Sequence, residues 1–474
     1  DRTIVGDFYN EVYKITRLFI DSDLNTKVTI KCLADVSEDV KATLRLQYIK
    51  DFGDMLELNI TVPETVNPAD VELSFPALKY NKKNVASITF DDSAALWNNI
   101  FSVINRRWVD DELLSYFIPG DTRRFFFHKG FQYVKDGITH TKSTGLYPAK
   151  FIEYTDGAGI KHRYGFSLSA WSSKMTDRDY VGGYMWPWTT AAEARQMADF
   201  GFSLDFHDIE GITDPDIADT SQETFDSLVK ADGERFCAVT DRTPKTGSYP
   251  NGHSVYNRFS DCPLMDFRYT QTNLPAPYMS GYYKPFSIEK FLDKKLFVPF
   301  RDFILNDYTL TTFKNKIIAS MSQPEADRVW MILGLHTPVR DSGFYEFFTE
   351  IESLYGASGD DSLWFPAIDE FFEYWFMTKF GAVHKEVSGQ NIKFRIYAPC
   401  GKNFYFRSIS CLLSGIADLI GVTISSSDNC KGTSYSINDG KLLVNLDFNT
   451  DLLAKVEKYL QIFEADPAQE YAYE

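Results

Sequence analysis

The sequence predicts an α/β protein whose central region is flanked by two β regions. Apolar strands and amphipathic helices alternate between residues 85 and 380, which is typical of a parallel barrel or an open α/β sheet. On either side of that region, apolar and polar residues alternate with a period of two, as in half-buried antiparallel strands. We therefore expect a small β domain over residues 1–80, an α/β domain over 81–384 and a C-terminal β domain over 385–474.

Each region is defined by its expected elements. Period-two strands are predicted at 28–32, 42–48, 55–62, 392–397, 422–425 and 441–447. Central strands are predicted at 85–90, 164–170, 202–206, 236–239 and 328–335, and helices at 94–107, 190–200, 222–231, 310–321, 343–355 and 368–380. The aromatic segment 119–163 fits this alternation poorly, and Asp156-Gly157 is a typical hairpin turn. We interpret that segment as a hairpin inserted into the α/β domain.

The charge of the chain argues against nucleic acid as a partner, and its first residues bear on where the protein is located. The formal net charge is −17, with 49 basic and 66 acidic residues and no basic run, so a nucleic-acid binder is not expected. No stretch approaches the ~20 apolar residues of a membrane span. The chain begins at Asp1 without methionine, which a removed signal or lipoprotein leader would explain, as would trimming. We expect an extracytoplasmic protein (periplasmic, cell-surface or secreted), with a lipid anchor as one route to surface association.

The aromatic and cysteine contents each leave alternatives open. Aromatic residues make up 16% of the chain, which fits an aromatic-rich core, a sticky surface or a groove that stacks sugar rings. None of the six cysteines has CxxC spacing, which argues against a zinc–thiolate cluster. Free thiols are one interpretation, and disulfides among Cys400, Cys411 and Cys430 are another.

Two adjacent carboxylates, Asp91 and Asp92, directly follow the predicted strand 85–90. Catalytic groups of a parallel barrel lie at the carboxyl ends of its strands. Neighbouring carboxylates repel each other, so the pair calls for a cation or a shared proton, and a divalent metal is one solution. The other interpretation is that Asp92-Ser93 caps the following helix.

Two histidines also follow predicted strands. His207 comes after strand 202–206, and a neutral imidazole is a good ligand for Zn, Ni or Co. His336 ends strand 328–335, where it can donate a proton to a leaving group near neutral pH. A lone histidine is more often structural, so neither is decisive alone. The segment 237–252 is interpreted as a loop. No ligand spacing links the histidines at 128, 140, 162, 253 and 384.

Taken in order, these features resemble the polysaccharide deacetylase family (carbohydrate esterase family four, with the chitooligosaccharide deacetylase fold). Residues 80–92, ending in Thr-Phe-Asp-Asp, resemble the family's opening strand and paired aspartates. Similar segments follow for the helix before the histidine motif, the first half of that motif, the final histidine strand and the closing helix: 188–201, 201–207, 330–336 and 363–374. The resemblance covers residues 80–384.

The resemblance implies a deformed (β/α) barrel and metal-dependent hydrolysis of acetyl groups on a polysaccharide or oligosaccharide. Asp91 would be the general base that takes a proton from a metal-bound water, the nucleophile. Asp92 and His207 would hold a divalent metal, Zn in the first place and Ni or Co as alternatives. His336 would protonate the leaving amine or alkoxide. A divalent ion lowers the pKa of bound water and polarises the acetyl carbonyl.

The chain also departs from the family pattern. Gly211 stands where the family has its second metal-binding histidine, so Asp208, Glu210 or a water would have to take that place. The family's Arg-Pro motif is not recognisable at 239–244, and Arg242 is not assigned its role.

Two smaller departures concern the strand ends. Gly334 replaces an apolar residue two before the last histidine, which would widen the acetyl pocket, and Ser93 replaces a glycine. Because of the departures, a catalytically impaired barrel that binds glycans stays as the alternative to an active deacetylase. A third option is a glycosidase with two acids about 5 to 9 Å apart. Carbohydrate is the expected partner in each case.

Overall fold

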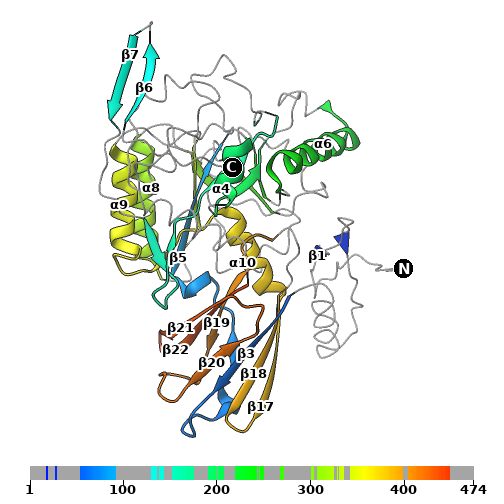
Figure 1. Ribbon diagram of the computed structural model, residues 1–474, viewed down its shortest axis with the longest axis vertical. Coiled ribbons are helices and arrows are strands. Elements are labelled where there is room, and N and C mark those ends of the chain that lie inside the picture. Colours follow the sequence, from blue (N-terminus) through cyan, green and yellow to red (C-terminus); the bar gives the residue numbers. More distant parts are fainter. Residues whose placement is uncertain are drawn as a thin grey trace.

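The computed structural model describes residues 18–19, 27–28, 54–91, 130–135, 138–143, 152–173, 175, 191–199, 201–207, 219–242, 244, 246–249, 267–271, 300–303, 307–324, 328, 330–335, 342–398 and 404–448. These residues form an α/β region and an antiparallel β region, joined by the strand β5 and the helix α10 (Figure 1).

The α/β region is built on an eight-stranded sheet whose paired strands are all parallel. Its order is β10-β11-β12-β13-β14-β15-β5-β16, and β10 also pairs with β5, so the sheet curls back on itself. The strands are β5 (Asn84–Phe90), β10 (Ser167–Ala170), β11 (Ser203–Phe206), β12 (Thr246–Tyr249), β13 (Phe267–Gln271), β14 (Phe300–Phe303), β15 (Met331–Leu335) and β16 (Leu363–Trp364). The predicted α/β class is confirmed, while a complete (β/α) barrel stays a prediction.

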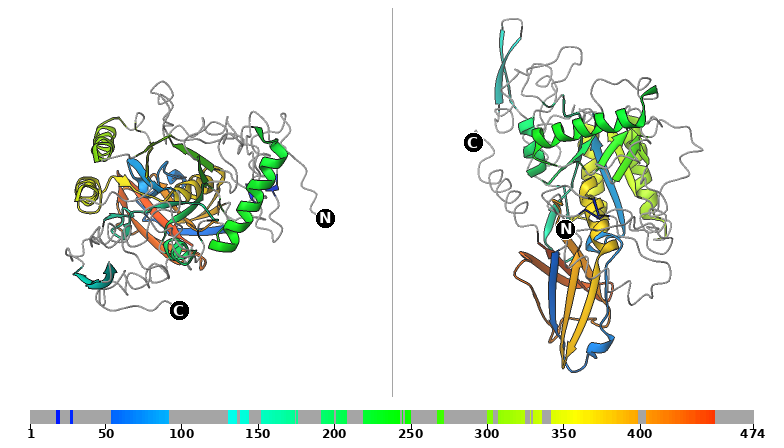
Figure 2. Two further views of the ribbon diagram at one scale, coloured as in Figure 1. Left: turned by 90° about the horizontal axis from the view of Figure 1, so that it is seen from above. Right: turned by 90° about the vertical axis from the view of Figure 1, so that its right-hand side faces the viewer.

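Four helices described by the structure lie around this sheet: α4 (Ala191–Asp199), α6 (Gln222–Thr240), α8 (Asp307–Met321) and α9 (Ser342–Tyr355). A fifth, α10 (Ile368–Phe380), lies between the sheet and the antiparallel β region (Figure 1). Seen from above, α8 and α9 lie on one side of the strands and α6 on the other (Figure 2). The helix predicted at 368–380 has the observed bounds, and those at 190–200, 310–321 and 343–355 are confirmed within a few residues.

The strand predicted at 236–239 is wrong, because α6 continues through it to Thr240. Ser221 caps the helix by accepting a hydrogen bond from the backbone N–H of Thr224 at 3.2 Å. Phe225, Val229 and Phe236 are buried along α6, and their spacing of four and seven residues places them on one helical face. The short apolar run was therefore part of a helical stripe.

The loop predicted at 237–252 is corrected by the same finding. Its first residues belong to α6, and the strand of this βα unit is β12, which pairs in parallel with β11 and β13. The sequence of β12 is Thr-Gly-Ser-Tyr, which lacks the apolar character on which strand prediction depends.

Strands from both flanking regions share two antiparallel sheets. The first has the order β17-β18-β3-β20 and the second β21-β22-β19-β4. Their strands are β3 (Asp54–Thr61), β4 (Leu73–Ser74), β17 (Ala382–Ser388), β18 (Asn391–Ala398), β19 (Ser408–Leu413), β20 (Thr423–Ser426), β21 (Gly432–Asn438) and β22 (Lys441–Asp447). β3 lies between β18 and β20, so residues 54–74 and 382–447 build one β sandwich. The predicted domain boundaries themselves stay a prediction.

Two hairpins lie within the segment interpreted as an insertion. β6 (Gly130–Lys135) pairs with β7 (Ile138–Ser143), and β8 (Glu153–Thr155) pairs with β9 (Lys161–Arg163). The turn expected at Asp156-Gly157 joins β8 to β9, and the backbone N–H of Asp156 donates to the carbonyl of Ile160 at 2.9 Å. This turn rests on the β sandwich, because Asn445 Nδ2 donates to the Asp156 carbonyl at 2.7 Å.

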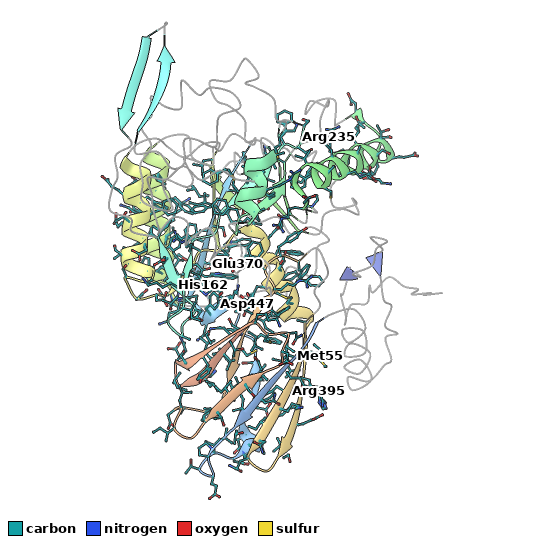
Figure 3. All side chains as sticks on the ribbon, viewed as in Figure 1. Met55, His162, Arg235, Glu370, Arg395 and Asp447 are labelled. Atoms are coloured by element: carbon teal, nitrogen blue, oxygen red, sulfur yellow. The ribbon has the colours of Figure 1, made fainter. Side chains whose placement is uncertain are left out.

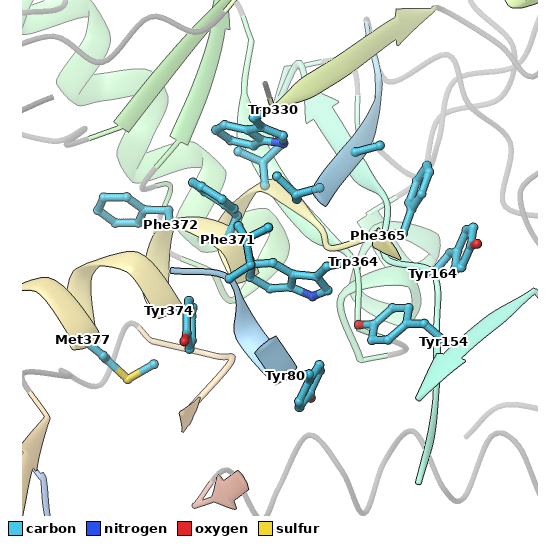
Figure 4. Packing of buried hydrophobic residues seen from close by; sticks show 14 of the residues in the cluster. Tyr80, Tyr154, Tyr164, Trp330, Trp364, Phe365, Phe371, Phe372, Tyr374 and Met377 are labelled. Carbon is cyan, nitrogen blue, oxygen red and sulfur yellow. The ribbon is translucent and has the colours of Figure 1, made fainter. Parts of the chain in front are cut away.

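Aromatic side chains account for much of the described core (Figure 4). Trp330 stacks on Phe371 with ring centroids 4.0 Å apart, and Tyr164 stacks on Phe365 at 4.4 Å. Trp364, between β5 and α10, is fully buried. Among the large hydrophobic side chains of the described residues, Tyr435 is the one exposed aromatic. For this part of the chain, the high aromatic content reflects an aromatic-rich core.

A buried polar junction connects the α/β region to the sandwich. Lys79 and Glu370 form an ion pair of 2.8 Å whose side chains are only 4% and 10% exposed. The Tyr80 ring stacks on the His162 ring, with their centroids 5.0 Å apart. Lys79 Nζ lies over the Tyr80 ring, 4.9 Å from its centroid. His162, Glu370 and Asp447 lie where the two regions meet (Figure 3). We call Lys79, Tyr80, His162 and Glu370 the junction.

The structure tests the predictions about two of the cysteines and about membrane-spanning helices. Cys411 and Cys430 carry free thiols, so the free-thiol alternative holds for these two, and burial raises the pKa of the Cys411 thiol well above its usual value. Cys400 lies outside the described residues. None of the described helices is long and apolar enough to cross a membrane.

Candidate functional site

Asp91 lies at the carboxyl end of β5. Every residue of β5 is buried, as expected for a central parallel strand rich in β-branched and apolar side chains. The side chain of Asp91 is also buried, and its backbone N–H donates to the carbonyl of Leu335 at 2.8 Å. The β15 ladder therefore extends to Asp91 and holds this carboxylate on a rigid strand end.

His207 lies at the carboxyl end of β11, as predicted. Its backbone N–H donates to the carbonyl of Ala170 on β10 at 3.2 Å. The side chain is 2% exposed, and its Nδ1 lies 2.6 Å from the hydroxyl oxygen of Ser248 on β12. The described strands thus bring Asp91 and His207 to one end of the sheet, separated by the single strand β10.

The enclosed face of the sheet, which we call the inner face, is polar. Thr89, Ser167 and Ser203 are level on β5, β10 and β11. Side chains two residues apart on a strand point to the same face, so Asp91 and His207 share the inner face with them. Its other buried members on these strands and on β12 are Ser169, Asp205, Thr246 and Ser248.

Below His207, a second row of polar groups crosses the same strands. Thr246 Oγ1 donates to a carboxylate oxygen of Asp205 and lies 2.8 Å from Oδ1 of Asp369, in the first turn of α10. Ser203 Oγ lies 3.1 Å from the same Asp205 oxygen and 2.6 Å from Ser167 Oγ. Because buried polar groups need partners, these contacts hold α10 and three strands together beneath the site.

Several predicted site residues cannot be placed by this structure. Asp92 and His336 lie outside the described residues, as do Ser93, Asp208, Glu210 and Gly211. Gly334 is buried on β15 opposite Thr89. Arg242 lies just after α6, with its guanidinium carbon 4.2 Å from the centre of the Tyr405 ring, which is a cation–π contact.

Of the two expected metal ligands, the structure describes His207. In residues that the structure describes, no three His, Cys, Asp or Glu side chains are grouped closely enough to hold an ion. His207 nevertheless has the surroundings of a ligand, because its Nδ1 is engaged by Ser248 and ligating histidines commonly hydrogen-bond through their second nitrogen. Asp91 adds a buried carboxylate nearby. Asp92, the other expected ligand, lies outside the described residues, so the metal stays a prediction.

Sequence reasoning missed Ser248, Thr246, Asp205 and Asp369. One signal was present, since Ser203, Asp205 and His207 alternate with apolar residues in Ser-Leu-Asp-Phe-His. A buried parallel strand is normally apolar on both faces, so polar residues with a period of two indicate a polar interior.

Comparison with known proteins identifies the family. The family model "Putative polysaccharide deacetylase" matches residues 56–472, which is most of the chain, and the chain belongs to this family. The match includes the β sandwich as well as the α/β region. The predicted resemblance is therefore confirmed, and the chain is a member of a family of hydrolases named for deacetylation of polysaccharides.

Other comparisons add less. The crystal structure of a putative polysaccharide deacetylase from Mycobacterium smegmatis is similar over 66% of this chain and 96% of that one, with 11% identity and a TM-score of 0.34. That score is too low to support an argument about the site. A search of curated proteins found no match.

Proposed function

We propose that this protein hydrolyses acetyl groups on a polysaccharide or oligosaccharide with the help of a divalent metal, Zn in the first place and Ni or Co as alternatives. The observation that carries the proposal is the placement of buried Asp91 and His207 at the same end of one sheet, on strands separated by β10, in a chain of the polysaccharide deacetylase family. The deformed barrel and the extracytoplasmic location belong to the same proposal.

Each residue has one task in this proposal. His207 and Asp92 hold the metal, which supplies a water of lowered pKa and polarises the acetyl carbonyl. Asp91 accepts a proton at a carboxylate oxygen as water attacks the carbonyl carbon. His336 donates a proton to the departing nitrogen or oxygen, so the C–N or C–O bond breaks and acetate is released.

The inner face supports this chemistry by keeping both groups fixed. Asp91 is bound to β15 through its backbone and His207 to β10 and β12. Groups on rigid strands lose little freedom when substrate binds, which favours the reactive geometry. Burial also excludes competing water from the carboxylate and the imidazole.

The test combines metal analysis with acetate release from acetylated oligosaccharides. Wild-type protein should bind Zn²⁺ and release acetate, and His207→Gln, which keeps a polar side chain of similar size, should lose both. His384→Gln is the matched control, because His384 is half exposed on β17 of the sandwich. Absence of both metal and acetate release with every divalent ion tried would overturn the proposal.

The same samples decide between catalysis and simple binding. A catalytically impaired glycan-binding barrel would bind oligosaccharide saturably and retain that binding in Asp92→Ala. An active metal-dependent deacetylase would lose metal and acetate release in that variant. Cell fractionation checks the extracytoplasmic location separately.

A further inference from the structure

We propose that Ser248 is a positioning residue that fixes the ring of His207 and leaves its Nε2 as the nitrogen that binds the metal. This inference rests on the proposed function, since it takes His207 to be a ligand. Ser248 lies in the segment that the sequence presents as a loop, and no feature of the sequence links it to His207.

The contact itself is short and secluded from water. Ser248 Oγ lies 2.6 Å from His207 Nδ1, and the two side chains are 1% and 2% exposed. A neutral imidazole carries one N–H and one free nitrogen, and the partner of one nitrogen decides which of them is free. When a metal binds Nε2, Nδ1 carries the proton and donates it to Ser248 Oγ.

The fold places Ser248 opposite His207 through the register of two strands. β11 and β12 pair with Phe206 level with Gly247. One row below, the Thr246 hydroxyl bonds to Asp205. Residues two apart point to the same face, so the contact between Asp205 and Thr246 requires the next pair, His207 and Ser248, to face each other.

The lower row is anchored outside the sheet as well. Thr246 Oγ1 lies 2.8 Å from Asp369 Oδ1, and the N–H of Ile368 donates to Ser167 Oγ at 2.8 Å. The start of α10 is thus bound to β12 and β10. This second attachment limits sliding of β12, so the distance between Ser248 and His207 is set by several contacts that do not involve either residue.

A serine beside His207 should affect the imidazole differently from a carboxylate. Ligating histidines often donate to a carboxylate, which orients the ring and also makes it more basic. A serine hydroxyl is neutral, so it orients the ring with less increase in basicity. Ser248 therefore acts on the direction of the Nε2 lone pair more than on its donor strength.

The test uses the full chain, Zn²⁺ alone as the probe, and two readouts. Calorimetry gives the Zn²⁺ affinity, and ¹⁵N NMR of histidine-labelled protein reports which ring nitrogen carries the proton. Ser248→Ala should weaken Zn²⁺ binding about 10- to 100-fold, and His207 of the metal-free protein should lose its preference for the Nδ1–H form. Ser248→Thr, which keeps the hydroxyl, should restore most of both.

Ser87→Ala is the matched control. Ser87 is equally buried on β5, but its hydroxyl bonds to the Pro366 carbonyl at 2.9 Å and accepts from Trp330 Nε1 at 3.2 Å. Removing it deletes a buried serine hydroxyl of the same sheet without touching His207. Its Zn²⁺ affinity and histidine spectrum should match wild type.

The outcomes separate this inference from the proposed function. Wild-type affinity and spectrum in Ser248→Ala, with binding lost in His207→Gln, overturn the role of Ser248 and leave the metal site intact. Unchanged Zn²⁺ binding in His207→Gln overturns the proposed function and this inference together. If Ser248→Ala does not fold, Ser248→Val, which has the shape of Ser248→Thr without the hydroxyl, is judged by the same two readouts.

Discussion

The inner face and the junction both bury polar side chains, but they compensate them in different ways. At the junction, Lys79 and Glu370 neutralise each other directly at 2.8 Å. On the inner face, hydroxyl groups of Ser203 and Thr246 link the carboxylates of Asp205 and Asp369. The charges of the Lys79–Glu370 ion pair are neutralised without a ligand. The row of hydroxyl and carboxylate groups on the inner face ends at His207 and Asp91, where we propose that a metal binds.

This contrast indicates which buried polar groups to associate with function. The ion pair joins two parts of the fold, so its loss should reduce stability. In the proposed function, Asp91 and His207 at the end of the inner face act on a metal and a substrate, so changes there should reduce activity more than stability. Four measurements test this contrast.

The largest effect is expected from Asp91→Asn. If Asp91 is the general base, the amide cannot accept the proton, and acetate release should fall about 10²- to 10⁴-fold. Zn²⁺ binding and the thermal midpoint should change little, because the backbone bond to Leu335 remains. Asp418→Asn in an exposed loop of the sandwich is the control, and equal activity losses in both variants would contradict the assignment.

Lys79→Met should have the opposite profile. It leaves the Glu370 carboxylate buried without its cation, and breaking a buried pair in this way costs about 3 to 5 kcal/mol of unfolding free energy. Urea denaturation measures the loss. The double variant Lys79→Met, Glu370→Leu removes both charges and should recover much of it; a double variant as unstable as the single one would show that the charge is not the cause.

A smaller, pH-dependent effect is expected at His162. Burial, and then the charge of Lys79, lower the pKa of this imidazole from 6.5 to about 4. The unfolded chain binds the proton more readily, so the stabilising contribution is complete above the unfolded pKa and is lost as the pH falls from 6.5 towards 4. The slope should not exceed about 1.4 kcal/mol per pH unit, because one proton is involved.

Comparison of wild type with His162→Gln isolates this contribution. Denaturation midpoints between pH 4 and 7 should fall less steeply in the variant. Parallel curves for the two proteins would show that His162 does not distinguish the folded from the unfolded state.

The smallest effect is expected at the surface. Lys230 and Glu234 lie 3.9 Å apart on α6 with both side chains about 70% exposed, and such pairs contribute about 0.3 to 0.5 kcal/mol. Glu234→Gln should therefore leave both activity and the denaturation midpoint nearly unchanged. If Glu234→Gln lost as much unfolding free energy as Lys79→Met, burial would not explain why the junction pair contributes more to stability.

Local pattern was sufficient for strongly periodic elements. β22 at Lys441–Asp447 and α10 at Ile368–Phe380 have the predicted bounds, and His207 and Asp91 follow the predicted strands. The prediction failed where a short segment had two interpretations. Phe236 belongs to the apolar face of α6, and its four-residue run looked like a strand because short apolar runs fit either structure.

The α/β class, most central elements and the family resemblance could be predicted from the sequence. So could the position of Asp91 and His207 at strand ends. All of these depend on periodicity or on motifs of a few neighbouring residues. Tertiary structure alone decided that β3 pairs with β18 and β20, that Asp369 reaches Thr246 and that Ser248 faces His207. These contacts join residues 41 to more than 300 positions apart. They follow from strand register and the packing of distant elements, which no local pattern specifies.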